Sequence, residues 1–371
     1  METKVPYGGP MKICLIFLML LLFLSNSSAG YCQIDGPIAK EALKKDTLAL
    51  LSSSQFKKLE ENAKRYKVKK ERFPDGCWKL YSFFDAFQYP PDKTDSSWKK
   101  HLNLLESWQA AYPASDAANS ALAGAWIGYA WFARGEDSTI KDGGYPLMVD
   151  RLGKAEKILK KVSSSYIPAL FLKLQLAVAN STPKNEFQAL LKKALSVEPS
   201  YLPFYSAAIR YYLPRWHGEP GEWVQQLERF DQTAPRKEGI YARVAFGYLG
   251  IEWNNFSEGT IKWEKVKKSL EGITYSSPWI DNMAASYSCL AGDYKMARVL
   301  LKKIGPNIYY PAWKNTNPNA CQQKAGLPSD FKGVDKSVDY QYMEELAKNN
   351  NLWATELLKK WKKYNMVGVT Y

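Results

Sequence analysis

The sequence has little histidine and lacks the short motifs that mark common active sites. Only two of its 371 residues, His101 and His217, are histidines. It contains no His-Glu-x-x-His, Gly-x-Ser-x-Gly, Cys-x-x-Cys or Gly-x-Gly-x-x-Gly motif and no glycine-rich phosphate-binding loop. Zinc sites, catalytic triads and dinucleotide sites therefore have no local signature here, and we expect neither a metal nor a cofactor. His101 follows two lysines, so we expect it to face solvent.

Apolar runs long enough to span a membrane are also missing, as are the patterns of β-strands. No sustained alternation of β-branched residues occurs, which argues against a sheet. The one long apolar run, from Ile13 to Leu24, is shorter than the ~20 residues of a membrane span but fits the ~7–15 of a signal peptide. Lys12 precedes it and small residues follow up to Gly30. We predict a cleaved signal and a periplasmic or extracellular protein, the alternative being an N-terminal membrane anchor.

Cysteine is scarce, but its number is informative once export is assumed. The cysteines that would remain after cleavage are Cys32, Cys77, Cys289 and Cys321. An oxidising compartment permits two bridges among four cysteines, with three connectivities. Cys289 and Cys321 are one candidate pair, although Cys289 lies in an apolar helical pattern and could equally be a buried free thiol.

Basic and aromatic residues are abundant. Lys and Arg number 51 against 37 Asp and Glu, a net charge of +14, and there are 13 Trp, 24 Tyr and 15 Phe. Such a charge attracts anionic partners, but the lysines are spread along the chain, which is typical of solvated helix surfaces. We expect no nucleic acid partner. Weak contact with an anionic membrane, through residues 359–363, remains an alternative. Most rings should pack in the core.

A degenerate repeat indicates the fold. Residues 165–168 (Ser-Tyr-Ile-Pro) recur 35 positions later at 200–203 (Ser-Tyr-Leu-Pro), and Lys pairs recur at 267–268 and 302–303. Lysines suit the last turn of a helix, and proline is tolerated in the first turn of the next one. A period near 35 predicts an all-α, tetratricopeptide-like, right-handed solenoid of antiparallel helix pairs.

This pattern suggests four parts. We predict a signal peptide (1–30), an N-terminal helical segment (31–115), tetratricopeptide-like repeats (116–305), and a loop with C-terminal capping helices (306–371). Residues 138–150 are expected to be a glycine-rich insertion between two helices.

Three stretches carry a resemblance to a known family. They are residues 75–80 (Asp-Gly-Cys-Trp-Lys-Leu), 129–135 (Tyr-Ala-Trp-Phe-Ala-Arg-Gly) and 213–223 (Leu-Pro-Arg-Trp-His-Gly-Glu-Pro-Gly-Glu-Trp). From roughly Leu50 to Gly305 the chain resembles the bacterial family called domain of unknown function 4034. The resemblance implies a tetratricopeptide-like helical fold and no particular chemistry.

The segment 214–223 is the most unusual local sequence. It could be a binding turn, with Arg for an anion, Trp for a sugar or proline ring, and His and Glu for a proton or a metal. We favour a connector between helices, in which Arg215 pairs with a nearby Glu or carbonyl and the tryptophans fill the core. The candidate residues are Arg215, Trp216, His217, Glu219 and Trp223.

These patterns predict a function of binding. Our first hypothesis is an exported, non-catalytic scaffold of the cell envelope that holds a protein or peptide in a groove between stacked helices. Further groove candidates are Arg134, Arg210 and Asn282. The alternative is an enzyme that processes envelope polysaccharide or peptide, with carboxylates near residues 215–223.

Overall fold

A computed structural model describes residues 36–92, 94–135, 141–248, 261–305, 307–313 and 316–328, together with 343–344, 347–348, 355 and 358–359. All of these residues belong to one compact unit, residues 35–371. The predicted signal peptide, Cys32 and most of the predicted capping helices lie outside the described residues.

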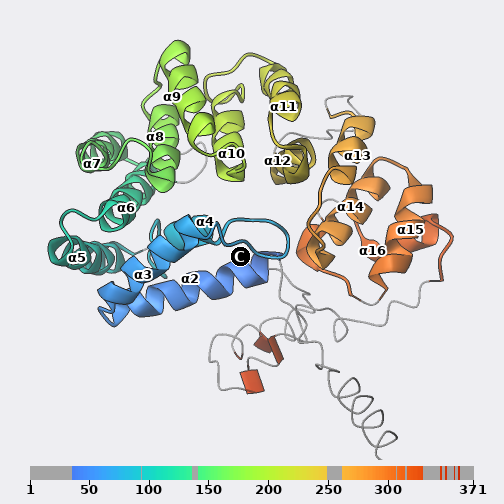
Figure 1. Ribbon diagram of the computed structural model, residues 1–371, viewed down its shortest axis with the longest axis horizontal. Helices are drawn as coiled ribbons and strands as arrows, with labels where there is room; N and C mark the ends of the chain where they lie inside the picture. The colour runs from blue at the N-terminus through green and yellow to red at the C-terminus, as the bar shows by residue number, and fades with distance from the viewer. Residues whose placement is uncertain are drawn as a thin grey trace, which may run out of the picture. The chain divides into compact units, whose positions relative to one another are not determined.

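The described part of the chain is helical (Figure 1). It contains no strand, and one isolated antiparallel bridge joins Arg72 to Trp78. The prediction of an all-α fold is confirmed. None of the described helices combines the length and apolarity needed to cross a membrane.

Three helices form the N-terminal part: α2 (Gly36–Ser52), α3 (Phe56–Val68) and α4 (Lys79–Asp85). Each packs against the other two. Residues 69–78, which we call the 69–78 loop, connect α3 to α4 and lie between α4 and the helices that follow α11 (Figure 1). This loop contributes Cys77 to the lining of the candidate site.

The following helices pack mainly in sequence order. Helices two apart also touch, since α6 contacts α8, α8 contacts α10, and α10 contacts α12. The bounds are α5 (Asp95–Ala111), α6 (Asp116–Arg134), α7 (Gly144–Leu159), α8 (Ile167–Ala179), α9 (Lys184–Val197), α10 (Leu202–Tyr211), α11 (Glu222–Thr233), η1 (Arg236–Glu238), α12 (Ile240–Tyr248), α13 (Trp263–Glu271), α14 (Pro278–Leu290), α15 (Tyr294–Ile304), η2 (Tyr310–Ala312) and α16 (Pro318–Lys324).

Local chemistry explains where these helices begin. α8 and α10 have proline in the first turn, and their first residues, Ile167 and Leu202, are 35 positions apart. The Ser277 side chain caps α14, and the Asp293 side chain caps α15. Such caps satisfy amide groups that have no partner within the helix, each contributing about 1 kcal/mol.

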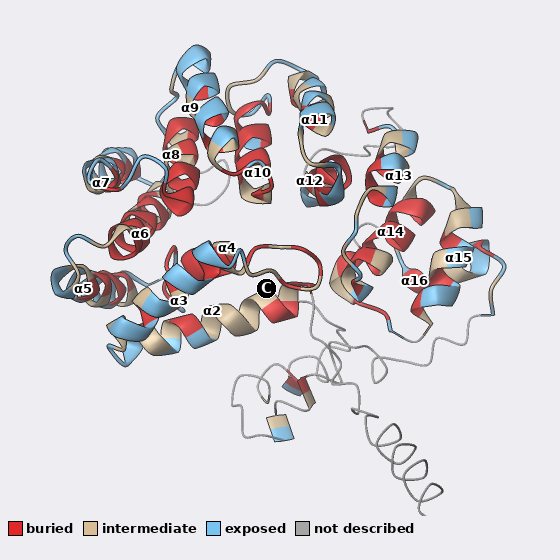
Figure 2. Cartoon of the chain, viewed as in Figure 1, coloured by how far each residue is buried: buried red, intermediate tan, exposed pale blue. Residues whose placement is uncertain are grey.

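The helices form two groups that differ in burial. α8 and α10 are buried on most faces, whereas α7 and α9 expose their outer faces (Figure 2). The exposed helices are amphipathic, and the buried ones are apolar nearly all round, as expected for elements covered on both sides. The buried helices α6, α8, α10 and α12 are also those that contact one another, and their faces contribute to the cavities described below.

The prediction for His101 was wrong. This residue is 4% exposed, and its Nε2 donates to the carbonyl oxygen of Phe87 at 2.9 Å. Burial lowers the pKa of the imidazole. The apolar positions of α5 include Trp98, Leu102 and Leu105, and a residue three positions after Trp98 shares their face. Helical spacing therefore decided the orientation of His101, and the two preceding lysines did not.

The boundary of the expected insertion was also wrong. α7 begins at Gly144, inside residues 138–150, with Pro146 in its first turn. Gly143 precedes the helix with a positive φ of 67°, so the glycines begin the helix instead of prolonging a loop.

One disulfide links the C-terminal helices. Cys289 of α14 and Cys321 of α16 are bonded, with 5.8 Å between their Cα atoms. Cys77, in the 69–78 loop, is a free thiol. A bridge that closes a loop of 32 residues contributes roughly 2–4 kcal/mol by restricting the unfolded chain.

Candidate functional site

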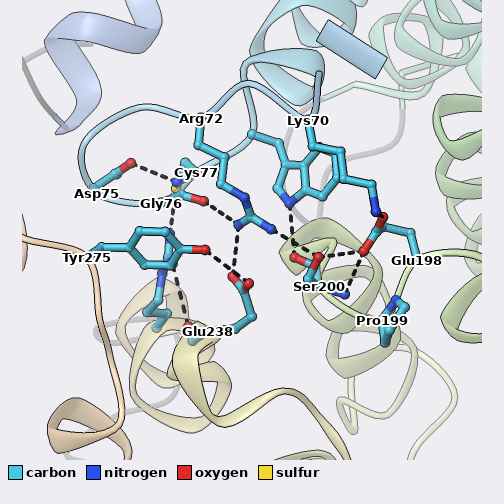
Figure 3. A network of polar contacts seen from close by, with 12 residues as sticks. Lys70, Arg72, Asp75, Gly76, Cys77, Glu198, Pro199, Ser200, Glu238 and Tyr275 are labelled. Atoms are coloured by element: carbon cyan, nitrogen blue, oxygen red, sulfur yellow. Dashed lines mark hydrogen bonds and ion pairs between the residues drawn. The ribbon is translucent and has the colours of Figure 1, made fainter. Parts of the chain in front are cut away.

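The 69–78 loop is held by a buried polar network (Figure 3). Arg72 Nη1 lies 2.9 Å from Glu238 Oε2, and Arg72 Nη2 donates to Ser200 Oγ at 3.0 Å. Trp78 Nε1 donates to the Ser200 carbonyl at 3.0 Å. The side chain of Glu238 is fully buried. Arg72 therefore connects the loop to residues 128 and 166 positions further along the chain.

Glycine is required near the tip of this loop. Gly76 has a φ of +78°, which favours glycine. A Cβ atom there would lie 2.4 Å from a ring carbon of Tyr275. The Gly76 carbonyl also accepts a hydrogen bond from Arg72 at 2.7 Å. The Gly76 backbone thus fits between the Arg72 guanidinium and the Tyr275 ring.

A second set of charged residues surrounds Cys77. Lys40 Nζ lies 2.7 Å from Asp75 Oδ2, and Arg243 Nη2 donates to Cys77 Sγ at 2.8 Å. Burial would raise the pKa of Asp75, but the charges of Lys40 and Arg243 outweigh it and keep this pKa below its usual range. Burial would lower the pKa of Lys40, but Cys77 and Asp75 raise it. Both ionised groups therefore stabilise the folded chain.

We expect Asp75 to make the stability of the protein sensitive to acid. Because its pKa is lower in the folded than in the unfolded chain, its stabilising effect is complete above the unfolded pKa, near 3.9, and disappears as the pH falls through the folded pKa. In urea unfolding at pH 7, the free energy of unfolding of Asp75→Asn should be well below that of the wild type. The difference between the two should disappear below about pH 4. Asp150→Asn, which removes an exposed ion pair to Lys154, is the control. A gap that stays constant with pH would contradict the expectation.

A cavity of about 640 Å³ lies beside this loop. Aromatic and aliphatic side chains make up much of its lining, together with the amides of Gln88 and Gln175. None of the described residues in its lining is Asp or Glu, whereas three carry positive charge. The lining includes Tyr89, Trp131, Phe171, Tyr248, Arg210 and Arg215.

A second cavity of about 490 Å³ adjoins the first. It is lined by Phe246, Trp279, Met283 and Tyr310, among others. The two cavities share four lining residues, so we treat them together as the groove; the shared residues are Lys40, Cys77, Leu202 and Gly247. Space of this size, mostly apolar with a few polar groups, is typical of ligand sites.

No protein-family model matches the sequence, nor does any curated protein. The resemblance to the 4034 family stays a prediction, and inference about function depends on the groove itself.

The structure divides the unusual segment 214–223 into two parts. Arg215 is exposed and lines the first cavity, as does Arg210 at the end of α10. His217 instead joins neighbouring helices, because its Nε2 donates to the Val178 carbonyl at 2.7 Å. Trp216 packs edge-on against Trp131 with 5.5 Å between ring centroids.

The remaining candidate residues of this segment are Glu219, which precedes α11, and Trp223, which lies in its first turn. Trp223 is buried, and its ring centroid lies 6.2 Å from that of Tyr248. Glu219 is exposed, and its backbone amide donates to the Glu222 carboxylate at 3.0 Å. Neither lines the groove. The segment is thus mainly a helix connector that presents one arginine, Arg215, to the first cavity.

Two other predicted candidates lie away from the groove lining. The guanidinium of Arg134 is 5.9 Å from the Trp131 ring centroid, at the end of α6. Asn282 is fully buried and makes hydrogen bonds to the segment that follows α15. Its role is structural.

The groove contains residues that sequence patterns did not single out. Lys40 comes from α2, Phe246 from α12, and Trp279 from α14. Most rings were expected to pack in the core, yet the Trp131 ring is half-buried and lines the first cavity. The 75–80 stretch pointed to the site because it contains Cys77. The sequence around it did not indicate which distant helices it would contact.

Proposed function

We propose that this protein is an exported, non-catalytic binding scaffold whose groove holds an extended peptide segment of another envelope protein. The observation that carries the proposal is the pair of adjoining cavities, with aromatic and aliphatic walls and an excess of cations. Export is part of the proposal and depends on the pattern from Lys12 to Gly30.

The proposal includes a tetratricopeptide-like, right-handed solenoid. Two features support it: the 35-residue spacing of the first residues of α8 and α10, and the contacts that join α6, α8, α10 and α12 in order. In such folds the helices of one layer line a surface that binds extended segments. The resemblance to the 4034 family points the same way.

An extended peptide suits the groove chemically. The two cavities can take successive side chains, and the aromatic rings provide apolar contact area. Gln88 Nε2 donates to Gln175 Oε1 over 3.3 Å, a long bond that a ligand amide could replace. The cations favour acidic over basic segments.

An enzyme acting on polysaccharide has less support in this groove. Such chemistry usually needs two carboxylates on opposite sides of the scissile bond. Among the described residues that line the groove only one, Asp75, is acidic, and it is paired with Lys40. The Arg215 turn supplies none to the lining, because Glu219 points elsewhere.

Gly247 offers a direct test of groove binding. It lies in α12 and lines both cavities, and a Cβ added to it would meet no atom of the described residues within 4 Å. Gly247→Leu should therefore fill the groove without disturbing the fold. Gly153 in α7 is the matched control, since it is also helical and open but lines neither cavity.

The readout is the alkylation of Cys77 by iodoacetamide in a Cys32→Ser background. The probe is a pool of decapeptides made of Gly, Leu, Phe and Asp with free carboxyl ends. We expect the pool to slow alkylation at least about fivefold in the wild type and in Gly153→Leu, because a bound ligand would cover the thiol. In Gly247→Leu the protection should disappear. No protection of the wild type, or equal protection of Gly247→Leu, would contradict groove binding.

A further inference from the structure

Two guanidinium groups beside the first cavity have no acidic partner among the residues that the structure describes. Arg210 and Arg215 are both exposed, and no described residue forms an ion pair or hydrogen bond with either side chain. Within the described part of the chain, the guanidinium carbon of Arg210 lies 5.6 Å from the centroid of the Trp216 ring. The expected pairing of Arg215 with a nearby Glu is not made among the described residues.

Other cations of the groove are compensated. Lys40 is paired with Asp75. Burial would lower the pKa of Arg243, but Cys77 and the charges of Asp75 and Glu238 raise it. Arg72, behind the groove wall, is paired with Glu238. The positive charge of the first cavity is therefore concentrated at Arg210 and Arg215, and none of the described lining residues there bears a carboxylate.

Both arginines act on the same part of the cavity. Burial raises the pKa of Tyr248 to about 12, and the charges of Arg210 and Arg215 each oppose this rise. Tyr89, on the same lining, also feels the charge of Arg210. Two positive charges thus converge near the Tyr248 ring.

We propose that Arg210 and Arg215 form a carboxylate subsite that anchors the bound peptide at one end of the groove. The guanidinium group is a planar fork of donors that matches the two oxygens of a carboxylate. The rings of Trp131 and Phe171 on the same lining would hold the apolar part of the ligand. This proposal rests on the proposed function and adds the chemical group that is recognised.

The carboxylate can belong to the peptide terminus or to an acidic side chain, and three probes separate these sources. Each is a rhodamine-labelled decapeptide of Gly, Leu and Phe. The first has a free terminal carboxylate, the second an amidated terminus, and the third an amidated terminus with one internal Asp. Fluorescence polarisation gives the dissociation constant of each.

We expect the wild type to bind a carboxylate-bearing probe at least about tenfold more tightly than the amidated neutral one, which is about 1.4 kcal/mol. Arg210→Gln and Arg215→Gln should each remove most of this preference while still binding the neutral probe. Arg298→Gln removes one exposed charge on α15, outside the lining of both cavities, and should keep the preference. Preference for the first probe identifies the terminus, and preference for the third an acidic side chain.

Two results would overturn the subsite. One is equal binding of all three probes, unchanged by Arg210→Gln and Arg215→Gln, which would leave groove binding intact. The other is retention of the preference when both arginines are replaced. Failure of every peptide to bind, with binding of a short oligogalacturonate instead, would reject the peptide proposal as a whole.

Discussion

Replacing Arg72 by methionine should lower the free energy of unfolding by about 3–5 kcal/mol. The substitution leaves the carboxylate of Glu238, which is fully buried, without its main cationic partner. It also removes the hydrogen bond from Arg72 to Ser200 Oγ. Urea unfolding at neutral pH measures the change.

Two further variants make this expectation specific. The double variant Arg72→Met, Glu238→Met has no unpaired buried charge. It should therefore recover much of the free energy of unfolding that Arg72→Met loses. Arg65→Met removes a surface ion pair to Glu71, whose side chains are 45% and 25% exposed, and should cost no more than about 1 kcal/mol. If Arg72→Met costs no more than Arg65→Met, the 69–78 loop is not held as described.

Replacing Asn282 by alanine should cost at least about 3 kcal/mol, because several buried polar groups lose their partner at once. Its Nδ2 donates to the carbonyls of Pro278 and Asn307, at 2.8 and 2.9 Å. Its Oδ1 accepts from Tyr309 N and Trp313 Nε1, each at 2.9 Å. This one side chain therefore connects α14 to the segment after α15.

Asn103→Ala is the matched control, since Asn103 is an exposed residue of α5. It should change stability by less than about 0.5 kcal/mol. Thermal or urea unfolding of the two variants compares them directly. Similar stabilities for Asn282→Ala and Asn103→Ala would show that water replaces the lost bonds.

The two predictions also bear on the groove. Arg72 holds the loop that contains Cys77, and Asn282 holds the segment that contributes Tyr310 to the second cavity. A variant of either residue that binds ligand weakly could therefore be unfolded or could lack a groove contact, and a binding measurement would not distinguish the two. Gly247, Arg210 and Arg215 are better positions for testing function, because they lie at the surface of the groove.

Part of the candidate site could be predicted from sequence. Arg215 was predicted as a candidate binding residue because charged and aromatic residues cluster around two prolines and two glycines in its segment. Arg210 was named as a groove position on a helix. Asn282, named on the same grounds, is buried and structural, because the polarity of a side chain does not tell whether buried backbone groups will use it.

The sequence by itself determined the helices of this protein. Proline in the first turn, side-chain caps and apolar spacing are local signals, each read within a few residues, and they set the all-α fold and the 35-residue spacing of the first residues of α8 and α10. Even the orientation of His101 was present in the spacing of α5.

Only the tertiary structure decided which cations are paired. Arg72 meets Glu238, and Arg243 meets Cys77, in each case across 166 positions of sequence. Arg210 and Arg215 meet no acidic group among the described residues. Electrostatic energy depends on distance through space and on burial, and neither quantity can be obtained from the spacing of residues along the chain. The location of the uncompensated charge, and with it the candidate subsite, followed from the packing of distant helices.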